Sequence, residues 1–375
     1  ISPLRDSYGL GELTIKATPL AIIAIGLAIG FRANVWNIGA EGQLTLGAIT
    51  GGGLALLFYG AEGPWLPPLM LIGGMIGGAA WAAIPAFLRT RFNANEILVS
   101  LMLTYVSVQL LYYLMRGPWK DPDSYNFPLA PMLPEQGHLP TLFGRAHIGV
   151  VVAVAVIALF AVAVNRTAWG FELRVAGSSG ATARYAGISL KRKILTVMVL
   201  SGGVAGFAGG VELSGNADRI TEGLSNGFGF AGIIVAALAL MRPSGVAAVA
   251  LLFGAVQIGG QSIQTMGVSS SVSTILQALI LFGAIAAGVL GRYRIQMVAG
   301  DLLYATEGSS GAPVLNAYNK LTGEHVGEIL IPSPGQYGMM SFLHHDYQHI
   351  VVQVGQPGRL VALRLPGMDI GGQEH

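Results

Sequence analysis

We predict an all-α polytopic membrane protein that carries a small soluble β tail. Three observations predict this fold class. First, 53% of the 375 side chains are hydrophobic and only 11% are charged, whereas a soluble globular domain has about 25% charged residues. Second, long uncharged runs follow one another through residues 1–296. Third, residues 297–375 change to short alternating segments separated by Gly and Pro, a pattern typical of β-strands.

The composition also excludes several classes of protein. So few charged residues exclude an ordinary soluble enzyme, and so many hydrophobic ones exclude a disordered chain. The chain has no cysteine, which excludes disulfides, a thiolate zinc site and a cysteine nucleophile. We assign no metal site and no cofactor.

The uncharged runs predict nine transmembrane helices in the chain. A helix needs about 20 mostly apolar residues to cross roughly 30 Å of hydrocarbon, and continuous apolar runs favour helices over a barrel. The run 243–291 has no charged residue and predicts two helices that turn near residues 267–271, where Gly and Ser cluster. Seven further runs predict one helix each, and they are residues 17–31, 42–61, 63–88, 97–116, 148–165, 194–211 and 223–241.

The distribution of Lys and Arg predicts the orientation of these helices, because short loops rich in them stay in the cytoplasm. Within residues 1–296, alternate loops hold twelve such residues on one side and six on the other. We expect the first side, which includes Arg32, Arg166 and Arg242, to be cytoplasmic. Residue 1 then lies outside, and the chain begins with Ile, so we expect one further helix before it and ten in the intact protein. The expected location is the plasma membrane, which in bacteria is the inner membrane.

Glycine spacing predicts that some of these helices pack closely. Gly74 and Gly78 are four residues apart, and Gly202, Gly206 and Gly210 continue the same spacing in another run. Small residues at every fourth position let two helix backbones approach, as in multi-helix transporters and channels.

A polar insertion between the first two predicted helices is the first candidate for a functional site. Residues 31–43 contain Asn34, Asn37, Glu41 and Gln43 between apolar segments. Amides and a carboxylate at that depth are costly unless they face protein, water or a ligand. The functional interpretation is a discontinuous helix that lines a translocation path. The alternative is a short cytoplasmic loop with an ordinary helix start at Glu41.

Asn93, Asn95 and Glu96 repeat this pattern before the fourth predicted helix. We include them as candidates for the translocation path. The alternative is a helix N-cap followed by a glutamate in the first turn.

The cytoplasmic loop 165–193 is the second candidate site. Its middle is rich in Ala, Gly and Ser with single charges between them. Small residues suit a surface on which a partner presses closely, and the alternative is a basic anchor for lipid headgroups. The candidate coupling residues are Glu172, Arg174, Gly177, Ala183, Arg184, Ala186 and Gly187.

Three motifs together resemble a known family. They are Asn-Ile-Gly-Ala-Glu-Gly-Gln at 37–43, Ala-Arg-Tyr-Ala-Gly-Ile at 183–188 and Gly-Phe-Gly-Phe-Ala-Gly-Ile at 227–233. In order and spacing they resemble the permease subunits of ABC importers for nucleosides and simple sugars, in the branched-chain amino acid and ribose-type permease superfamily. The resemblance covers residues 1 to about 296. It implies that the cytoplasmic loop is the coupling helix and that the other two motifs lie near the translocation path, which adds Phe228 and Phe230 to the candidates.

The resemblance implies that the chain moves a solute and catalyses no reaction itself. No lysine follows a glycine anywhere in the chain, so a P-loop of the Gly-Lys-Ser/Thr type is absent and ATP hydrolysis is expected in a separate subunit. The implied partners are an ABC ATP-binding subunit, a second homologous permease subunit, an extracytoplasmic substrate-binding protein and the lipid bilayer. No nucleic-acid partner is expected.

The tail has a different resemblance. Residues 313–323 and 347–355 look like the closing blade of pyrroloquinoline-quinone-dependent dehydrogenases. About 80 residues build two β-sheets at most, whereas a propeller needs at least about four blades, so we expect no complete quinone site. The predicted orientation also places this tail in the cytoplasm, and we expect a fusion or misassembly junction near residues 296–300.

Two other functions stay open. An ion-coupled secondary transporter would need titratable residues inside its helices, yet the runs 97–116 and 243–291 contain no acid and no histidine. A membrane-anchored quinoprotein dehydrogenase fragment is suggested by the tail alone. The identity of the solute, whether a nucleoside, a ribose-like sugar or another small polar molecule, is left open by the residues.

Overall fold

The computed structural model of the chain describes residues 7–60, 63–125, 127–225, 227–264, 269, 271–292, 302–307, 313–319, 322–331, 335–344, 347–354 and 359–364. The chain divides into two compact units, residues 1–281 and residues 282–375. The junction expected near residues 296–300 lies outside the described residues, and the domain boundary at residue 296 stays a prediction.

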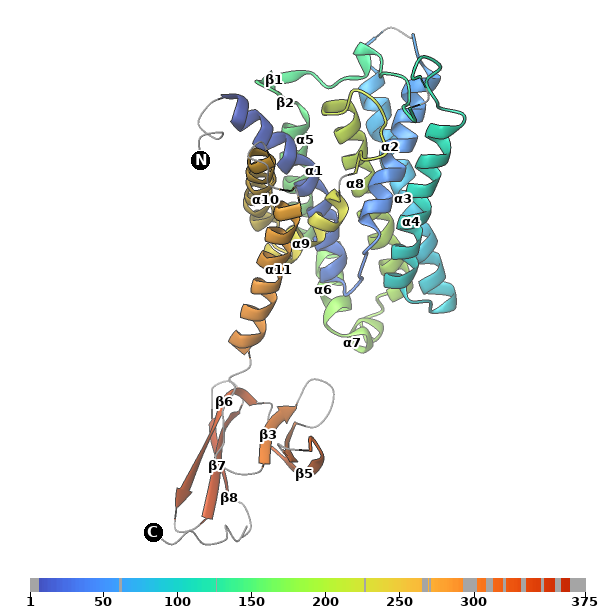
Figure 1. Ribbon diagram of the computed structural model, residues 1–375. Coiled ribbons are helices and arrows are strands. Elements are labelled where there is room, and N and C mark those ends of the chain that lie inside the picture. The colour runs from blue at the N-terminus through green and yellow to red at the C-terminus, as the bar shows by residue number, and fades with distance from the viewer. Residues whose placement is uncertain are drawn as a thin grey trace. The chain divides into compact units, whose positions relative to one another are not determined.

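The first unit is a bundle of long helices (Figure 1). Six of the described helices are long and apolar enough to cross a membrane. They are α1 (Ser7–Arg32), α3 (Leu66–Phe92), α4 (Glu96–Arg116), α5 (Gly149–Arg166), α8 (Leu190–Gly215) and α10 (Pro243–Gln264). The remaining helices are α2 (Ala40–Leu57), α6 (Ala168–Ser178), α7 (Gly180–Tyr185), α9 (Phe228–Leu238) and α11 (Ser271–Arg292). Each of the nine predicted segments contains one helix, which confirms the predicted helical membrane fold.

Helix α9 is shorter than predicted. Residues 223–241 were expected to form a complete membrane span, but α9 has 11 residues, or about 16 Å of helix, so the full-length prediction is wrong. Its start follows Gly227, whose φ is +77°, and its end precedes Leu240 and Met241, whose φ values are +50° and +57°. Two successive left-handed residues cannot continue a right-handed helix. Of the turn expected at residues 267–271, only residues 269 and 271 are among the described residues.

The segment 165–193, expected to be a loop, is largely helical. Thr167 caps α6 because its hydroxyl accepts a hydrogen bond from the Gly170 N–H at 3.2 Å. Ser179 caps α7 in the same way, with its hydroxyl 3.3 Å from the Thr182 nitrogen. These side chains satisfy N–H groups that a helix start leaves unpaired, so they divide the segment into two short helices.

Glycines bring α2, α3 and α8 into backbone contact. A Cβ atom added to Gly47 would lie 2.1 Å from the Gly206 carbonyl oxygen. One added to Gly206 would lie 2.2 Å from the oxygen of Gly74, and one added to Gly78 would lie 2.3 Å from that of Gly202. No larger residue fits these positions at the present helix separation. The predicted close packing through glycine is therefore confirmed.

Helix α1 is the most deeply buried of the six long apolar helices. Leu20, Ile22, Ile23 and Ile25 are buried, and α1 contacts α5, α8, α9 and α10. The buried Thr18 hydroxyl donates a hydrogen bond to the Thr14 carbonyl oxygen at 2.7 Å, so its own helix satisfies this polar group. The neighbouring helices bury every residue of α1 from 17 to 31.

The connections between helices differ at the two ends of the bundle (Figure 1). One end carries α6 and α7. The other carries the segment 117–148, which includes the hairpin of β1 (Thr141–Phe143) and β2 (Ala146–His147). Backbone hydrogen bonds from Leu133 to Asp218 and from Leu139 to Ser214, at 2.8 and 2.7 Å, tie this segment to α8 and the residues after it.

The second unit contains two antiparallel three-stranded sheets. The first has the order β3 (Leu302–Glu307), β4 (Val314–Asn319), β5 (His325–Leu330), and the second has the order β6 (Gly335–His344), β7 (Tyr347–Val354), β8 (Arg359–Arg364). Val314 lies opposite Glu307 and Leu330 in the first sheet. The β-rich tail is therefore confirmed, and its likeness to a quinoprotein blade stays a prediction.

Candidate functional site

The link between α1 and α2 combines exposed and buried polar residues. Asn34 is exposed in a left-handed turn with φ +55°, and its side-chain oxygen accepts a hydrogen bond from the Trp36 indole at 3.1 Å. Val35 and Asn37 are buried. The chain therefore turns at the end of α1 and re-enters the bundle before α2 begins.

Asn37 and Gln43 form a buried amide pair. The Asn37 amide nitrogen donates to the Gln43 side-chain oxygen at 2.8 Å, and the Gln43 amide nitrogen donates back to the Asn37 oxygen at 2.9 Å. Asn37 also donates to the Ser201 hydroxyl on α8 at 3.1 Å. Its oxygen accepts the Gly39 N–H at 3.2 Å. Buried amides are stable when paired in this way, so the pair fixes the start of α2 against α8.

Glu41 connects α2 to α9. Its two carboxylate oxygens accept the N–H groups of Gly227 and Gly229 at 3.0 and 2.6 Å. Glu41 is 5% exposed. A negative charge at a helix N-terminus interacts favourably with the helix dipole and with N–H groups that lack an intrahelical partner. Within α9, Phe228 is buried and Phe230 is 41% exposed, so only the second phenylalanine reaches a surface.

The turn between α3 and α4 holds the other polar candidates. Asn93 is the C-cap residue of α3 and has a φ of +55°. Asn95 caps α4, because its side chain accepts from the Ile97 and Leu98 N–H groups at 2.9 and 3.4 Å. Glu96 forms an ion pair with Arg89. These contacts explain the residue types as helix caps, and a role in the translocation path stays a prediction.

The candidate coupling residues on α6 pack against the bundle. Glu172 forms an ion pair with Lys193 of α8, and the Arg174 guanidinium donates to the Val164 carbonyl oxygen at 2.6 Å. A Cβ atom on Gly177 would lie 2.0 Å from the Arg32 carbonyl oxygen. Glycine at 177 therefore lets α6 lie directly against the end of α1.

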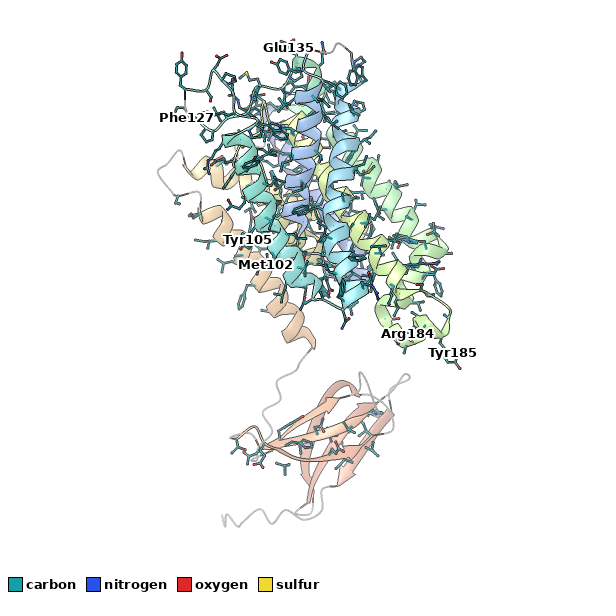
Figure 2. All side chains as sticks on the ribbon, turned by 90° about the vertical axis from the view of Figure 1, so that its right-hand side faces the viewer. Met102, Tyr105, Phe127, Glu135, Arg184 and Tyr185 are labelled. Carbon is teal, nitrogen blue, oxygen red and sulfur yellow. The ribbon has the colours of Figure 1, made fainter. Side chains whose placement is uncertain are left out.

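The tip of α7 faces away from the bundle. Ala183 is buried, whereas Arg184, Ala186 and Gly187 are exposed. Tyr185 is 99% exposed and projects from the same tip as Arg184 (Figure 2). Sequence reasoning missed Tyr185. The one sequence feature that could have identified Tyr185 is that it is an aromatic residue among small ones, in a segment already predicted to be a docking surface.

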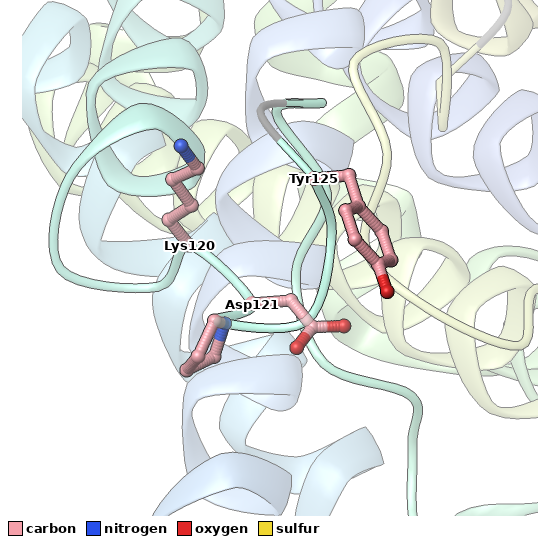
Figure 3. Close-up of a pocket in the computed structure, with 4 residues that line it drawn as sticks. Lys120, Asp121 and Tyr125 are labelled. Carbon is pink, nitrogen blue, oxygen red and sulfur yellow. The ribbon is translucent and has the colours of Figure 1, made fainter.

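The opposite end of the bundle presents a second exposed tyrosine. Lys120, Asp121, Pro122 and Tyr125 line an open pocket of about 410 Å³ (Figure 3). Tyr125 is 93% exposed. Sequence reasoning placed this segment on the outer side and assigned no functional site to it, because its charges and prolines are equally typical of an ordinary loop.

A buried acid was also missed. Glu212 is 4% exposed in α8, and its carboxylate accepts the Asn216 amide at 2.6 Å. Lys16 of α1 supplies a nearby positive charge. The charge of Glu212 ended the uncharged run at residue 211, so the predicted helix stopped one residue before it.

The fold and these sites define a polytopic membrane transport subunit. It combines a bundle of membrane-spanning helices, buried polar contacts between helices and a two-helix element exposed at one end. Residues 9–288 match the family described as branched-chain amino acid transport system / permease component. The chain belongs to this family.

Curated relatives cover most of the chain. It is 35% identical over 79% of its length to the glucose ABC transporter permease protein of Haloferax volcanii, of which the match covers 80%. It is 31% identical to the guanosine ABC transporter permease protein of Bacillus subtilis, over 79% of this chain and 85% of that one. A nucleoside ABC transporter permease protein of Lactococcus lactis is 27% identical over 75% of this chain and 80% of its own.

Family membership decides between the functions left open by the sequence. The chain is a multi-pass membrane permease subunit of an ABC importer and is not itself an enzyme. Such a permease works with an ATP-binding subunit and a solute-binding protein. The ion-coupled transporter and the quinoprotein dehydrogenase fragment are therefore set aside.

Proposed function

We propose that this permease carries a nucleoside or a simple sugar across the membrane. The observation that supports this is the similarity to permeases named for glucose, guanosine and nucleosides, each covering at least three quarters of the chain. A sugar ring is common to all these solutes. The ATP-binding subunit supplies the energy, and the bundle alternates access between the two sides of the membrane.

The solute class is tested by uptake into proteoliposomes that contain the complete importer. Radiolabelled glucose and radiolabelled guanosine are supplied separately with ATP inside the vesicles. Saturable, ATP-dependent uptake of one of them is the expected result. If neither is taken up while a labelled branched-chain amino acid is, the proposed solute class is wrong.

The α6–α7 element is the surface that receives the motion of the ATP-binding subunit. Its inner side is fixed to the bundle by the Glu172–Lys193 ion pair and by the contact of Gly177 with α1. Its outer tip presents Arg184 and Tyr185. A large aromatic side chain that is exposed on a rigid support is typical of a residue that dominates an interface. Force on the tip would pass directly to α1 and α8.

The segment 117–148 at the other end of the bundle is the docking surface for the solute-binding protein. A second homologous permease subunit completes the translocation path. Tyr125 there is nearly as exposed as Tyr185, at 93% against 99%. The two tyrosines therefore form a matched pair of probes at opposite ends of the helical bundle (Figure 2).

Co-purification with the ATP-binding subunit and with the solute-binding protein tests both surfaces. Tyr185→Ala is expected to reduce capture of the ATP-binding subunit at least tenfold and to leave capture of the binding protein unchanged. Tyr125→Ala is expected to leave capture of the ATP-binding subunit unchanged. Gly177→Arg is a poor probe of docking because that position faces α1. Equal capture of the ATP-binding subunit by both tyrosine variants would contradict the coupling assignment.

A further inference from the structure

Helix α4 carries a polar stripe on its outward face. Tyr105, Gln109 and Arg116 are exposed, and Tyr112 between them is partly exposed. With 3.6 residues per turn, these four positions fall within about 60° of one another around the helix. Tyr105 is 65% exposed, and Figure 2 shows it beside Met102 on the side of α4 that faces away from the bundle.

The opposite face of α4 makes the contacts with the bundle. Ser100, Thr104 and Ser107 are buried there. Gly39 and Gly42 at the start of α2 lie against Ser100 and Thr104. These contacts fix the rotation of α4 about its axis, so the polar stripe faces outward because of helix packing.

Two members of the stripe lie deep in the membrane. At 1.5 Å per residue, Gln109 is about 10 Å from Arg116 along α4, and Tyr105 is about 16 Å from it, within a hydrocarbon layer of roughly 30 Å. Within the described part of the chain, neither the Tyr105 hydroxyl nor the Gln109 side-chain amide has a hydrogen-bond partner. An amide without a partner is costly against lipid tails.

The outward faces of two other helices have the composition that lipid requires. On α5 the exposed side chains between residues 151 and 162 are those of Val151, Val154, Ala155, Ala158, Leu159 and Val162. On α3 the exposed side chains between residues 72 and 87 are those of Ile72, Met75, Ile76, Ala80, Ile84 and Phe87. All are apolar, whereas the exposed face of α4 places the Tyr105 hydroxyl and the Gln109 amide among the apolar Leu98, Met102 and Val106. A polar neighbour would satisfy these two groups, and lipid tails would not.

The stripe ends near the segment that leads to α9. The Arg116 guanidinium carbon lies 5.2 Å from the centre of the Tyr112 ring. The same guanidinium pairs with Glu222 at 2.8 Å, and Glu222 precedes α9 by six residues. The stripe thus continues from the middle of α4 to the end of the bundle that carries segment 117–148.

We propose that Tyr105, Gln109 and Tyr112 line the solute path and contact the sugar ring of the solute. The tyrosine rings offer apolar faces to the C–H groups of a sugar, and the Gln109 amide offers one acceptor and two donors to its hydroxyl groups. This proposal rests on the proposed function, because it takes the solute to be a nucleoside or a sugar. The competing occupant of the stripe is a second permease subunit packed dry against it.

The absence of cysteine from the chain makes water access along α4 directly measurable. Gln109→Cys and Tyr105→Cys each introduce a single thiol into the chain within the assembled importer. Ala158→Cys on α5 is the matched control, since it is exposed on an apolar face at a similar depth. A charged, membrane-impermeant methanethiosulfonate reagent reacts with thiols that water reaches, and labelling is measured as a mass increase of this chain.

We expect the thiols on α4 to be labelled at least tenfold faster than the thiol on α5. We also expect the transported solute, whether glucose or guanosine, to slow the labelling of Gln109→Cys. Labelling as slow as in Ala158→Cys would overturn the proposal. A disulfide or cross-link to the neighbouring permease without labelling would also overturn the proposal. That result would assign the stripe to a dry interface between permease subunits.

A transport measurement separates solute contact from simple water access. Gln109→Leu is expected to reduce uptake at low solute concentration at least tenfold, Gln109→Asn to retain more of it, and Ala158→Leu to have no effect. Unchanged uptake by Gln109→Leu would show that Gln109 does not contact the solute. Uptake by the unmodified importer tests the proposed function separately, so the two failures are distinguishable.

Discussion

Replacing Glu41 with glutamine removes the charge that connects α2 to the start of α9. The carboxylate accepts two backbone N–H groups, one through each oxygen, at 3.0 and 2.6 Å. Glutamine has a single side-chain oxygen. Glu41→Gln therefore leaves either Gly227 or Gly229 with its N–H group facing an NH₂ group instead of an acceptor.

The expected cost follows from these two contacts. A buried N–H group without an acceptor costs about 1–3 kcal/mol. Loss of the negative charge at a partly buried helix N-terminus costs up to about 2 kcal/mol more. Because the two effects overlap at one group, we expect Glu41→Gln to lower the free energy of unfolding by about 2–4 kcal/mol.

Reversible unfolding of the purified chain in mixed micelles measures this difference. The matched control is Glu222→Gln, because Glu222 also loses a charged contact, but its ion pair with Arg116 is solvent-exposed. Such exposed pairs contribute about 0.2–1 kcal/mol. If Glu41→Gln is no more destabilising than Glu222→Gln, the buried carboxylate cap does not stabilise the bundle and the reasoning is refuted.

Three further outcomes are expected from the same unfolding measurement. Gly206→Ala should destabilise by about 1–3 kcal/mol, because its Cβ would lie 2.2 Å from a backbone oxygen of α3. The control is Gly259→Ala, whose Cβ would meet no atom of the described residues within 4 Å, and equal costs would argue against the helix contact. Asn37→Leu should cost about 1–3 kcal/mol by leaving the Gln43 amide unpaired, and a neutral effect would mean that the amide pair is replaceable. Burial lowers the pKa of His147 below its ordinary value of 6.5. The stability that the neutral ring contributes is therefore fully present above pH 6.5 and is lost as the pH falls below 6.5. The loss is at most about 1.4 kcal/mol per pH unit. His147→Gln should flatten that part of the stability profile, and an unchanged slope would assign the pH dependence to another group.

The membrane bundle could be predicted because its signal is local. Each long helix of the first unit follows from an uncharged run, and the glycine spacing around Gly206 indicates close packing before any partner is known. The partners themselves are not local. Asn37 bonds to Ser201, 164 residues away, and Glu41 bonds to Gly229, 188 residues away. No spacing rule links positions so far apart in the chain.

The errors have equally specific causes. The length of α9 was overestimated because hydropathy does not detect the left-handed residues Leu240 and Met241, which are not among the types that favour that conformation. The charge of Glu212 suggested a helix end, yet α8 continues to Gly215 because the carboxylate is buried and bonded to Asn216. The side chain of Tyr185 could not be oriented from a run of small residues. Its exposure depends on the caps that separate α6 from α7.

The deep burial of α1 has a consequence for the biosynthesis of the protein. The helix is made before α8, one of its principal neighbours, which begins 158 residues after α1 ends. At a synthesis rate of about 5–20 residues per second, α1 waits roughly 8–30 s before that neighbour starts to emerge. During this interval its apolar surface is covered by lipid, and its buried Thr18 is already satisfied within the helix. A helix that ends as the core of the bundle must therefore first be stable alone in the bilayer.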